Sequence, residues 1–128
     1  MRFLLDTQLA LWAYFEPRRL SVEARTVLEN RQNDIVFSTA SLWEIAMKRG
    51  LGKKEFQFDP RVLRRAMLDD GYEELAVLGP HAVEVDLLPP LHKDPFDRIL
   101  IAQAMVEGIT LLTADPVVAK YPGSVLKV

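Results

Sequence analysis

Short apolar runs alternate with helix-like segments along the whole length of this chain. The clearest runs cover residues 3–5, 35–37 and 109–113, and segments with the periodicity of amphipathic helices separate them. Such runs are typical of strands that are buried on both faces, and their alternation with helices indicates an α/β fold with a parallel sheet. The chain has 128 residues and no linker or repeat, so we expect one domain over residues 1–128.

Residues that begin and end helices divide the chain into expected elements. Asp94 is a good N-cap, Pro95 suits the first helical position, and Gly108 suits the end of the same helix. Ser41 and Glu44 have the spacing of a capping box, which predicts a helix that begins there. We further expect helices at residues 9–15, from 21 onward, at 62–70 and from 115 onward, and strands at residues 3–5, 35–37, 74–78, 110–112 and 125–127.

Four acidic residues each stand close to a point where an apolar run ends or a helix begins: Asp6, Glu44, Asp97 and Asp115. In an open parallel sheet the carboxyl ends of the strands share one crevice, where such folds bind ligands. We therefore expect these carboxylates to converge, although they are far apart in the sequence. Each acid also has a purely structural interpretation, as a helix cap or a partner of a helix dipole. The two roles are compatible, because a positive helix terminus helps to keep a clustered carboxylate ionised.

The donor atoms available to such a cluster limit its chemistry. The chain has no Cys, which excludes thiolate metal sites and disulfides. Four carboxylates suit a hard cation, Mg²⁺ or Mn²⁺, better than Zn²⁺. Carboxylates alone would repel a phosphodiester, whereas a bound divalent ion reverses the charge and makes water nucleophilic. The sequence shows no Ser–His or Cys–His pairing for acyl transfer, so we expect metal-dependent hydrolysis of phosphodiester bonds.

The basic residues bear on a nucleic-acid substrate. The net charge is −2, so any contact with a polyanion depends on a local patch. The densest basic region comprises Lys48, Arg49, Lys53, Lys54, Arg61, Arg64 and Arg65. It is either a solvated helix face or a surface that follows a phosphate backbone, and the sequence leaves both interpretations open.

The two His and two Trp residues have less specific interpretations. His81 and His92 lie in expected loops, where a single His is most often a surface residue, and we assign them no role. We expect Trp12 and Trp43 to pack against the core, with anchoring of a partner helix as the alternative. No apolar segment is long enough for a signal peptide or a membrane span, so we expect a cytoplasmic protein without a membrane partner.

Four blocks of sequence follow one another in a fixed order. They are Leu-Leu-Asp-Thr at residues 4–7, Ser-Leu-Trp-Glu-Ile-Ala-Met-Lys at residues 41–48, His-Lys-Asp-Pro-Phe-Asp-Arg-Ile-Leu-Ile-Ala-Gln-Ala at residues 92–104, and Leu-Thr-Ala-Asp-Pro at residues 112–116. Together they resemble the ordered motifs of PIN-domain proteins, and most of all the VapC-type toxins of bacterial toxin–antitoxin modules. The resemblance covers the chain from residue 3 to its end, and the third block is the most specific.

This resemblance implies a three-layer α/β/α fold with a mainly parallel central sheet. It also implies a Mg²⁺- or Mn²⁺-dependent endoribonuclease that cleaves RNA, a cognate antitoxin that inhibits it, and a homodimer. By position within the motifs, Asp6, Glu44 and Asp97 match the core catalytic and metal-binding acids of the family, and Asp115 matches its more variable fourth acid. Asp94 does not occupy a core position, and we interpret it as a helix cap.

Other classes of function fit less of the sequence. A phosphoacceptor receiver domain needs paired acids after its first strand, but only Asp6 stands there. A phosphatase with an Asp nucleophile needs Asp-x-Asp, which the sequence Asp6-Thr7-Gln8 lacks. The more serious alternative is a catalytically silent PIN fold that only binds RNA or protein. Many close relatives have His where this chain has Gln8, but the complete set of acids favours an enzyme.

Overall fold

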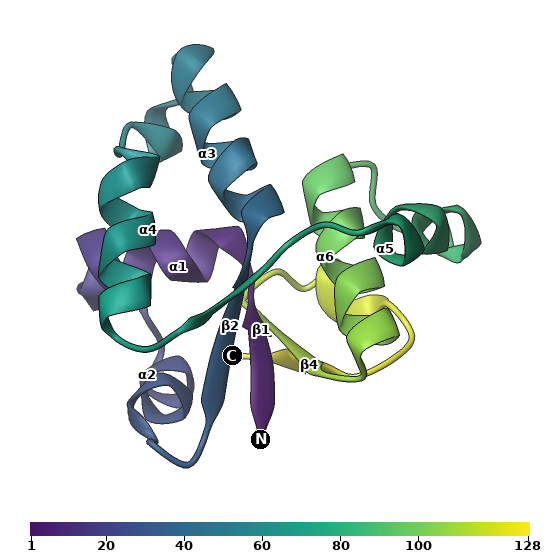
Figure 1. Ribbon diagram of the computed structural model, residues 1–128, viewed down its shortest axis with the longest axis horizontal. Coiled ribbons are helices and arrows are strands. Elements are labelled where there is room, and N and C mark those ends of the chain that lie inside the picture. The colour runs from purple at the N-terminus through teal and green to yellow at the C-terminus, as the bar shows by residue number, and fades with distance from the viewer.

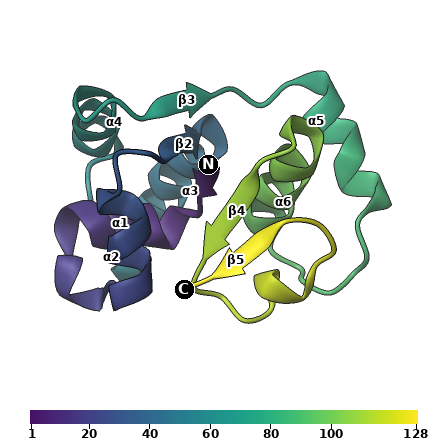
Figure 2. The ribbon, with the colours of Figure 1, turned by 90° about the horizontal axis from the view of Figure 1, so that it is seen from below.

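The computed structural model describes residues 1–128 as a five-stranded sheet with helices on both faces (Figures 1 and 2). The order of the strands is β3-β2-β1-β4-β5, and every pair of neighbours is parallel. The predicted α/β/α fold class is therefore confirmed, with a sheet that is parallel throughout. The strands are β1 (Arg2–Leu5), β2 (Asp34–Ser38), β3 (Glu73–Leu75), β4 (Thr110–Thr113) and β5 (Val125–Lys127).

Six α-helices and four 3-10 turns connect these strands. The α-helices are α1 (Thr7–Phe15), α2 (Val22–Glu29), α3 (Thr39–Gly50), α4 (Pro60–Asp69), α5 (Gly79–Glu84) and α6 (Pro95–Glu107). The 3-10 turns are η1 (Pro17–Arg19), η2 (Lys54–Phe56), η3 (Val85–Leu87) and η4 (Val118–Lys120). None of the helices combines the length and apolar character that crossing a bilayer would need.

The alternation of side chains along the strands divides the core into two layers. On β1, Phe3 and Leu5 pack on the face covered by α1 to α4, whereas Leu4 packs on the other face with α6. On β2, Phe37 joins the first layer and Val36 joins the second. Figure 1 shows the same division, with α1 to α4 on one side of the sheet and α5 and α6 on the other. Both faces of the central strands are therefore buried, which explains why these strands are apolar throughout.

The order of the strands places the ends of β1 and β4 side by side at the centre of the sheet. From β1 the chain passes first to β2 and β3 on one side, and later to β4 and β5 on the other. The backbone N–H of Asp6 donates a hydrogen bond to the carbonyl of Leu112 at 3.1 Å. Open parallel sheets bind ligands at this point, because the connections on either side diverge and leave a crevice.

Two of the predicted helix starts are wrong. Helix α3 begins at Thr39, capped by Ser38, whose hydroxyl accepts a hydrogen bond from the backbone N–H of Ala40 at 3.0 Å. Ser41 lies inside the helix, and its hydroxyl accepts from Thr7 at 2.9 Å. The predicted capping box does not form, because β2 runs directly into α3 and the last strand residue becomes the cap. After β4, Asp115 begins a turn, and η4 starts only at Val118.

The remaining boundaries agree better with the sequence. Asp94 caps α6 as predicted, and Gly108 ends that helix with a positive φ of 67°. The third strand is shorter than expected, over Glu73–Leu75, and the sequence did not predict the short helix α5 after it. Gly79 and Pro80 begin this helix, so His81 lies in a helix and not in the expected loop.

Candidate metal centre

The four acids predicted from the sequence line one cavity of about 320 Å³. Asp6 caps α1 directly after β1, and Glu44 lies on α3. Asp97 lies in the first turn of α6, and Asp115 follows β4. The structure therefore brings together all four side chains, at the central crevice where parallel strands end.

Asp6 is held rigidly at the base of this cavity. One oxygen, Oδ1, accepts a hydrogen bond from the backbone N–H of Leu9 at 2.8 Å, and the other, Oδ2, accepts from the hydroxyl of Thr113 at 2.6 Å. Burial raises the pKa of the Asp6 carboxyl to about 6, although both hydrogen bonds oppose the shift. The negative charge of Glu44 raises the same pKa further. A cation bound nearby would therefore favour the ionised form of Asp6.

Asp97 has a similar environment and a further partner. Burial raises the pKa of its carboxyl to about 7, and the charges of Asp94, Glu44 and Asp6 add to the effect. His92 Nε2 lies 2.9 Å from Asp97 Oδ2. His92 Nδ1 accepts a hydrogen bond from the backbone N–H of Asp94 at 3.3 Å, which assigns the proton to Nε2 and makes the ring a donor toward Asp97.

Asp115 completes this side of the cavity. Its Oδ2 lies 3.5 Å from His92 Nε2, and its Oδ1 accepts a hydrogen bond from the backbone N–H of Val117 at 2.8 Å. One N or O atom each from His92, Asp97 and Asp115 lie within 4.8 Å of one another. Because His92 Nε2 carries a proton, His92 acts here as a hydrogen-bond donor to the two acids, and the carboxylate oxygens remain as the metal donors. All five carboxylates, including Asp94, line the same cavity.

Glu44 provides the second observation that indicates a cation. It is only 4% exposed, and its Oε2 forms an ion pair with Lys48 Nζ at 2.6 Å. Its other oxygen, Oε1, is buried and has no hydrogen-bond partner. A buried acceptor without a partner is costly, and a metal ion bound at this oxygen would remove that cost. The residues present fit a hard divalent cation, because their donors are mainly carboxylate oxygens.

Three contributors to this site were not predicted from the sequence. His92, assigned no role, contacts two of the acids, and Thr113 positions Asp6. Lys48, grouped with the basic helix face, is paired inside the cavity instead. The only signal in the sequence was spacing: His92 lies five residues before Asp97, and Thr113 lies two residues before Asp115. That signal is weak, because a loop His and a strand Thr are common.

Three of the other six basic residues of this region are paired with nearby acids. Arg64 forms an ion pair with Glu74 at 2.6 Å, and Arg49 and Arg61 approach Asp59 at 3.9 and 3.6 Å. These contacts favour the solvated-face interpretation for this part of the chain.

Two further side chains differ from their expected positions. His81 is fully buried rather than at the surface, and its Nε2 lies 2.8 Å from Glu107 Oε2, which links α5 to α6. Trp43 is 64% exposed and contacts Phe96 edge-on, so it does not pack inside the core. Trp12 is partly buried against the core, as expected, and also lines the acidic cavity.

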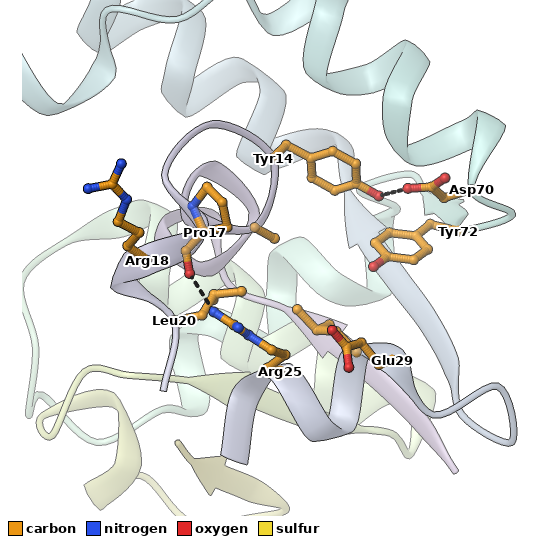
Figure 3. Close-up of a pocket in the computed structure, with 10 residues that line it drawn as sticks. Tyr14, Pro17, Arg18, Leu20, Arg25, Glu29, Asp70 and Tyr72 are labelled. Carbon is orange, nitrogen blue, oxygen red and sulfur yellow. Dashed lines mark hydrogen bonds between the residues drawn. The ribbon is translucent and has the colours of Figure 1, made fainter. Parts of the chain in front are cut away.

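A second pocket, shown in Figure 3, lies between the end of α1, η1, α2 and the turn after α4. Within it, the hydroxyl of Tyr14 donates to Asp70 Oδ2 at 2.6 Å, and Arg25 donates to the carbonyl of Pro17 at 3.0 Å. These polar groups satisfy one another. The pocket contains no cluster of carboxylates, and we therefore place the functional site at the acidic cavity.

Comparisons with known proteins agree with this fold. The family model described as PIN domain matches residues 3–123. No protein with a curated description matches the chain. One similar solved structure is VapBC2 from Rickettsia felis, which is bound to a DNA fragment from its promoter. Its TM-score is 0.75 and its identity 18%, and the comparison covers 100% of this chain and 99% of that chain.

Two further solved structures have the same fold. DNA-bound VapBC from Salmonella typhimurium has a TM-score of 0.64 and 16% identity, with coverage of 99% of this chain and 98% of that chain. FitAcB from Neisseria gonorrhoeae has a TM-score of 0.60 and 18% identity, with coverage of 98% and 96%. At these identities the three structures support the architecture alone. The family match spans nearly the whole sequence, and the chain therefore belongs to the PIN domain family.

Proposed function

We propose that this protein is a Mg²⁺- or Mn²⁺-dependent endoribonuclease, and the toxin of a toxin–antitoxin module. The observation that carries the proposal is the convergence of Asp6, Glu44, Asp97 and Asp115 on one cavity, with a buried Glu44 oxygen that lacks a partner. These four residues are the proposed catalytic and metal-binding acids. Membership of the PIN domain family and the order of the sequence motifs support the same activity.

Each side chain has a task that follows from its position. Asp6, held by Leu9 and Thr113, presents a carboxylate of fixed orientation. Glu44 contributes its unpartnered oxygen from α3. His92 orients Asp97 through its Nε2–H group, and the carboxylate of Asp115 lies near the same imidazole nitrogen. When bound, a divalent ion supplies the positive charge that attracts a phosphodiester and polarises it toward attack by water.

A cognate antitoxin is the partner that we propose for the toxin. The VapBC structures to which this chain is similar were solved with DNA, and the sequence motifs resemble those of VapC-type toxins. We propose that an antitoxin segment covers the acidic cavity, with an amphipathic helix that docks beside Trp12 and α3. Expression of this chain alone should then arrest growth, and co-expression with the antitoxin should restore it.

The direct test is RNA cleavage by purified protein before and after removal of divalent metal. We expect EDTA to abolish cleavage, and Mg²⁺ or Mn²⁺ to restore it. Ca²⁺ should fail, because it prefers a larger and more flexible oxygen shell. Cleavage that continues unchanged in excess chelator would contradict the metal-dependent mechanism. Metal binding without cleavage of any RNA would instead favour the catalytically silent binding module.

A further inference from the structure

Lys48 is the only lysine or arginine among the residues that line the acidic cavity. The same cavity contains five carboxylates, those of Asp6, Glu44, Asp94, Asp97 and Asp115. A cavity with this balance of charge repels any anion that approaches it. The ammonium group of Lys48 is therefore the one positive charge that the chain itself provides there.

Contacts on several sides hold the Lys48 ammonium in place. Its Nζ lies 2.6 Å from Glu44 Oε2, on the same helix, and 3.4 Å from Asp94 Oδ2, at the start of α6. The same nitrogen lies 4.8 Å from the centre of the Phe56 ring and 5.5 Å from that of Phe96. The Lys48 side chain is only 21% exposed. Burial alone would lower the pKa of Lys48, but the hydrogen bond and charge of Glu44 raise it above its ordinary value.

The two oxygens of Glu44 differ because of this contact. Lys48 occupies Oε2, and Oε1 stays buried without a partner. The ammonium thus selects which Glu44 oxygen is available to another cation. At the same time, its positive charge lies within a few ångströms of that oxygen and opposes the binding of a second positive charge.

We propose that Lys48 is a positioning and substrate-binding residue with opposite effects on the metal and on the nucleic acid. It holds Glu44 in place and weakens the binding of a divalent metal through like-charge repulsion. It also exchanges its longer contact with Asp94 for a phosphate oxygen of the substrate. The inference rests on the proposed function, because it assigns the phosphodiester and the metal to the same cavity. Its consequence is that metal and nucleic acid bind best together.

The test compares Lys48→Met with the parent protein at pH 8, where the carboxyls are ionised. We expect Mn²⁺, titrated calorimetrically without RNA, to bind roughly tenfold more tightly to Lys48→Met, because a nearby positive charge is gone. In the cleavage assay at saturating Mn²⁺, the KM for RNA should rise by about tenfold. Loss of a residue with a merely structural role would weaken the binding of both Mn²⁺ and RNA. Tighter Mn²⁺ binding together with a higher KM for RNA therefore identifies the proposed role.

Two variants control this experiment. Lys54→Met makes the same change at an exposed lysine on η2 and should leave Mn²⁺ affinity and KM unchanged. Lys48→Gln removes the charge but keeps a polar group. It replaces Lys48→Met in both measurements if Lys48→Met does not fold. Mn²⁺ affinity that is equal or weaker in a folded Lys48 variant would overturn the inference. The Mn²⁺ titration does not depend on turnover, so failure of the proposed ribonuclease activity would appear separately, as absence of cleavage by the parent.

Discussion

At the scale of single residues, Asp6 and Asp97 differ most from ordinary surface carboxyls. Burial raises the pKa of Asp6 to about 6 and that of Asp97 to about 7, from an ordinary value of 3.8. At pH values between the ordinary pKa of 3.8 and these raised pKa values, the folded chain holds more protons than the unfolded chain. The associated stability is therefore complete below about pH 4 and is lost as the pH rises through 6 and 7.

This linkage predicts a metal-dependent pH profile of stability. The free energy of unfolding of the metal-free protein should fall between pH 4 and pH 8, and the shift at Asp6 alone corresponds to roughly 3 kcal/mol. Saturating Mg²⁺ should remove most of the fall at pH 8, because the bound ion favours the ionised carboxylates. Urea unfolding at several pH values, with EDTA or Mg²⁺, measures both effects. A metal-free protein that becomes more stable from pH 5 to pH 8 would refute this interpretation.

The same two residues distinguish a metal ligand from a helix cap. Asp97→Asn and Asp6→Asn should each lower the rate of RNA cleavage by a hundredfold or more, on the order of what essential polar groups contribute. The double variant should be little worse than either single variant, because residues that act as one unit are not additive. At pH 8 Asp97→Asn should not destabilise the metal-free protein, since it removes a like charge from a buried cluster.

Cleavage rates and thermal melts on the same preparations provide the measurement. Asp86→Asn is the matched control, because Asp86 is exposed on η3 and does not line the cavity. It should retain both the fold and the parent rate. If Asp97→Asn and Asp6→Asn are folded and cleave RNA at nearly that rate, Asp6 is only a helix cap, Asp97 is only a first-turn acid that interacts with the helix dipole, and neither is a metal ligand.

At the scale of elements, helix termini hold the site together. Asp6 caps α1 and Asp94 caps α6, so the positive ends of two helices point toward the carboxylates. This arrangement offsets part of the repulsion among the acids. The other end of α6 matters as well, because Gly108 turns the chain from this helix into β4, which leads to Thr113.

Two glycines at the ends of helices test the importance of that turn. Gly108 has a φ of 67°, a left-handed conformation that L-residues adopt at a cost of roughly 1 to 2 kcal/mol, and a Cβ there would meet no atom. Gly108→Ala should therefore lower the free energy of unfolding by about that amount through backbone strain alone. Gly50→Ala, also without a clash but without a positive φ, should be neutral or stabilise by about 0.4 to 1 kcal/mol. Equal effects of the two substitutions in urea unfolding would contradict this reasoning.

At the scale of the whole molecule, an apolar surface lies beside the acidic site. A cavity of about 690 Å³ opens between α3, α5 and α6, and eight of the ten residues that line it are hydrophobic. Trp43 at its edge is 64% exposed, and Met47 and Val77 are each 40% exposed. Exposed apolar patches of this kind mark interaction surfaces, and we propose that this one is the interface of the homodimer that the sequence motifs imply.

This assignment predicts that Trp43→Glu converts a dimer into a monomer without unfolding it. A charged side chain would have to be desolvated at the interface, whereas the free surface tolerates it. Sedimentation equilibrium over a range of concentrations measures the change in mass. Val22→Glu is the control, since Val22 is 81% exposed on α2, on a different part of the surface. A dimer that persists in Trp43→Glu would locate the interface elsewhere.

The sequence by itself determined the class of fold and the family, and it predicted which acids would share one cavity. Buried parallel strands require continuous apolar runs, and an acid after such a run must lie at the end of the strand. Asp6 and Asp115 could therefore be assigned to one crevice without coordinates. Asp94 and Gly108 could be assigned to the two ends of α6, because cap preferences depend on local backbone geometry.

Only the tertiary structure decided how these acids are paired and oriented. The contacts of His92 with Asp97 and Asp115, and of Thr113 with Asp6, depend on the packing of elements that are remote in the sequence. The start of α3 at Thr39 depended on its direct junction with β2, which overrode the local capping pattern. Lys48 lies on that helix, and the packing of α3 against α6 turns its charge into the cavity beside Asp94, away from solvent. Periodicity and caps act within one element, whereas the environment of a charge depends on every element around it.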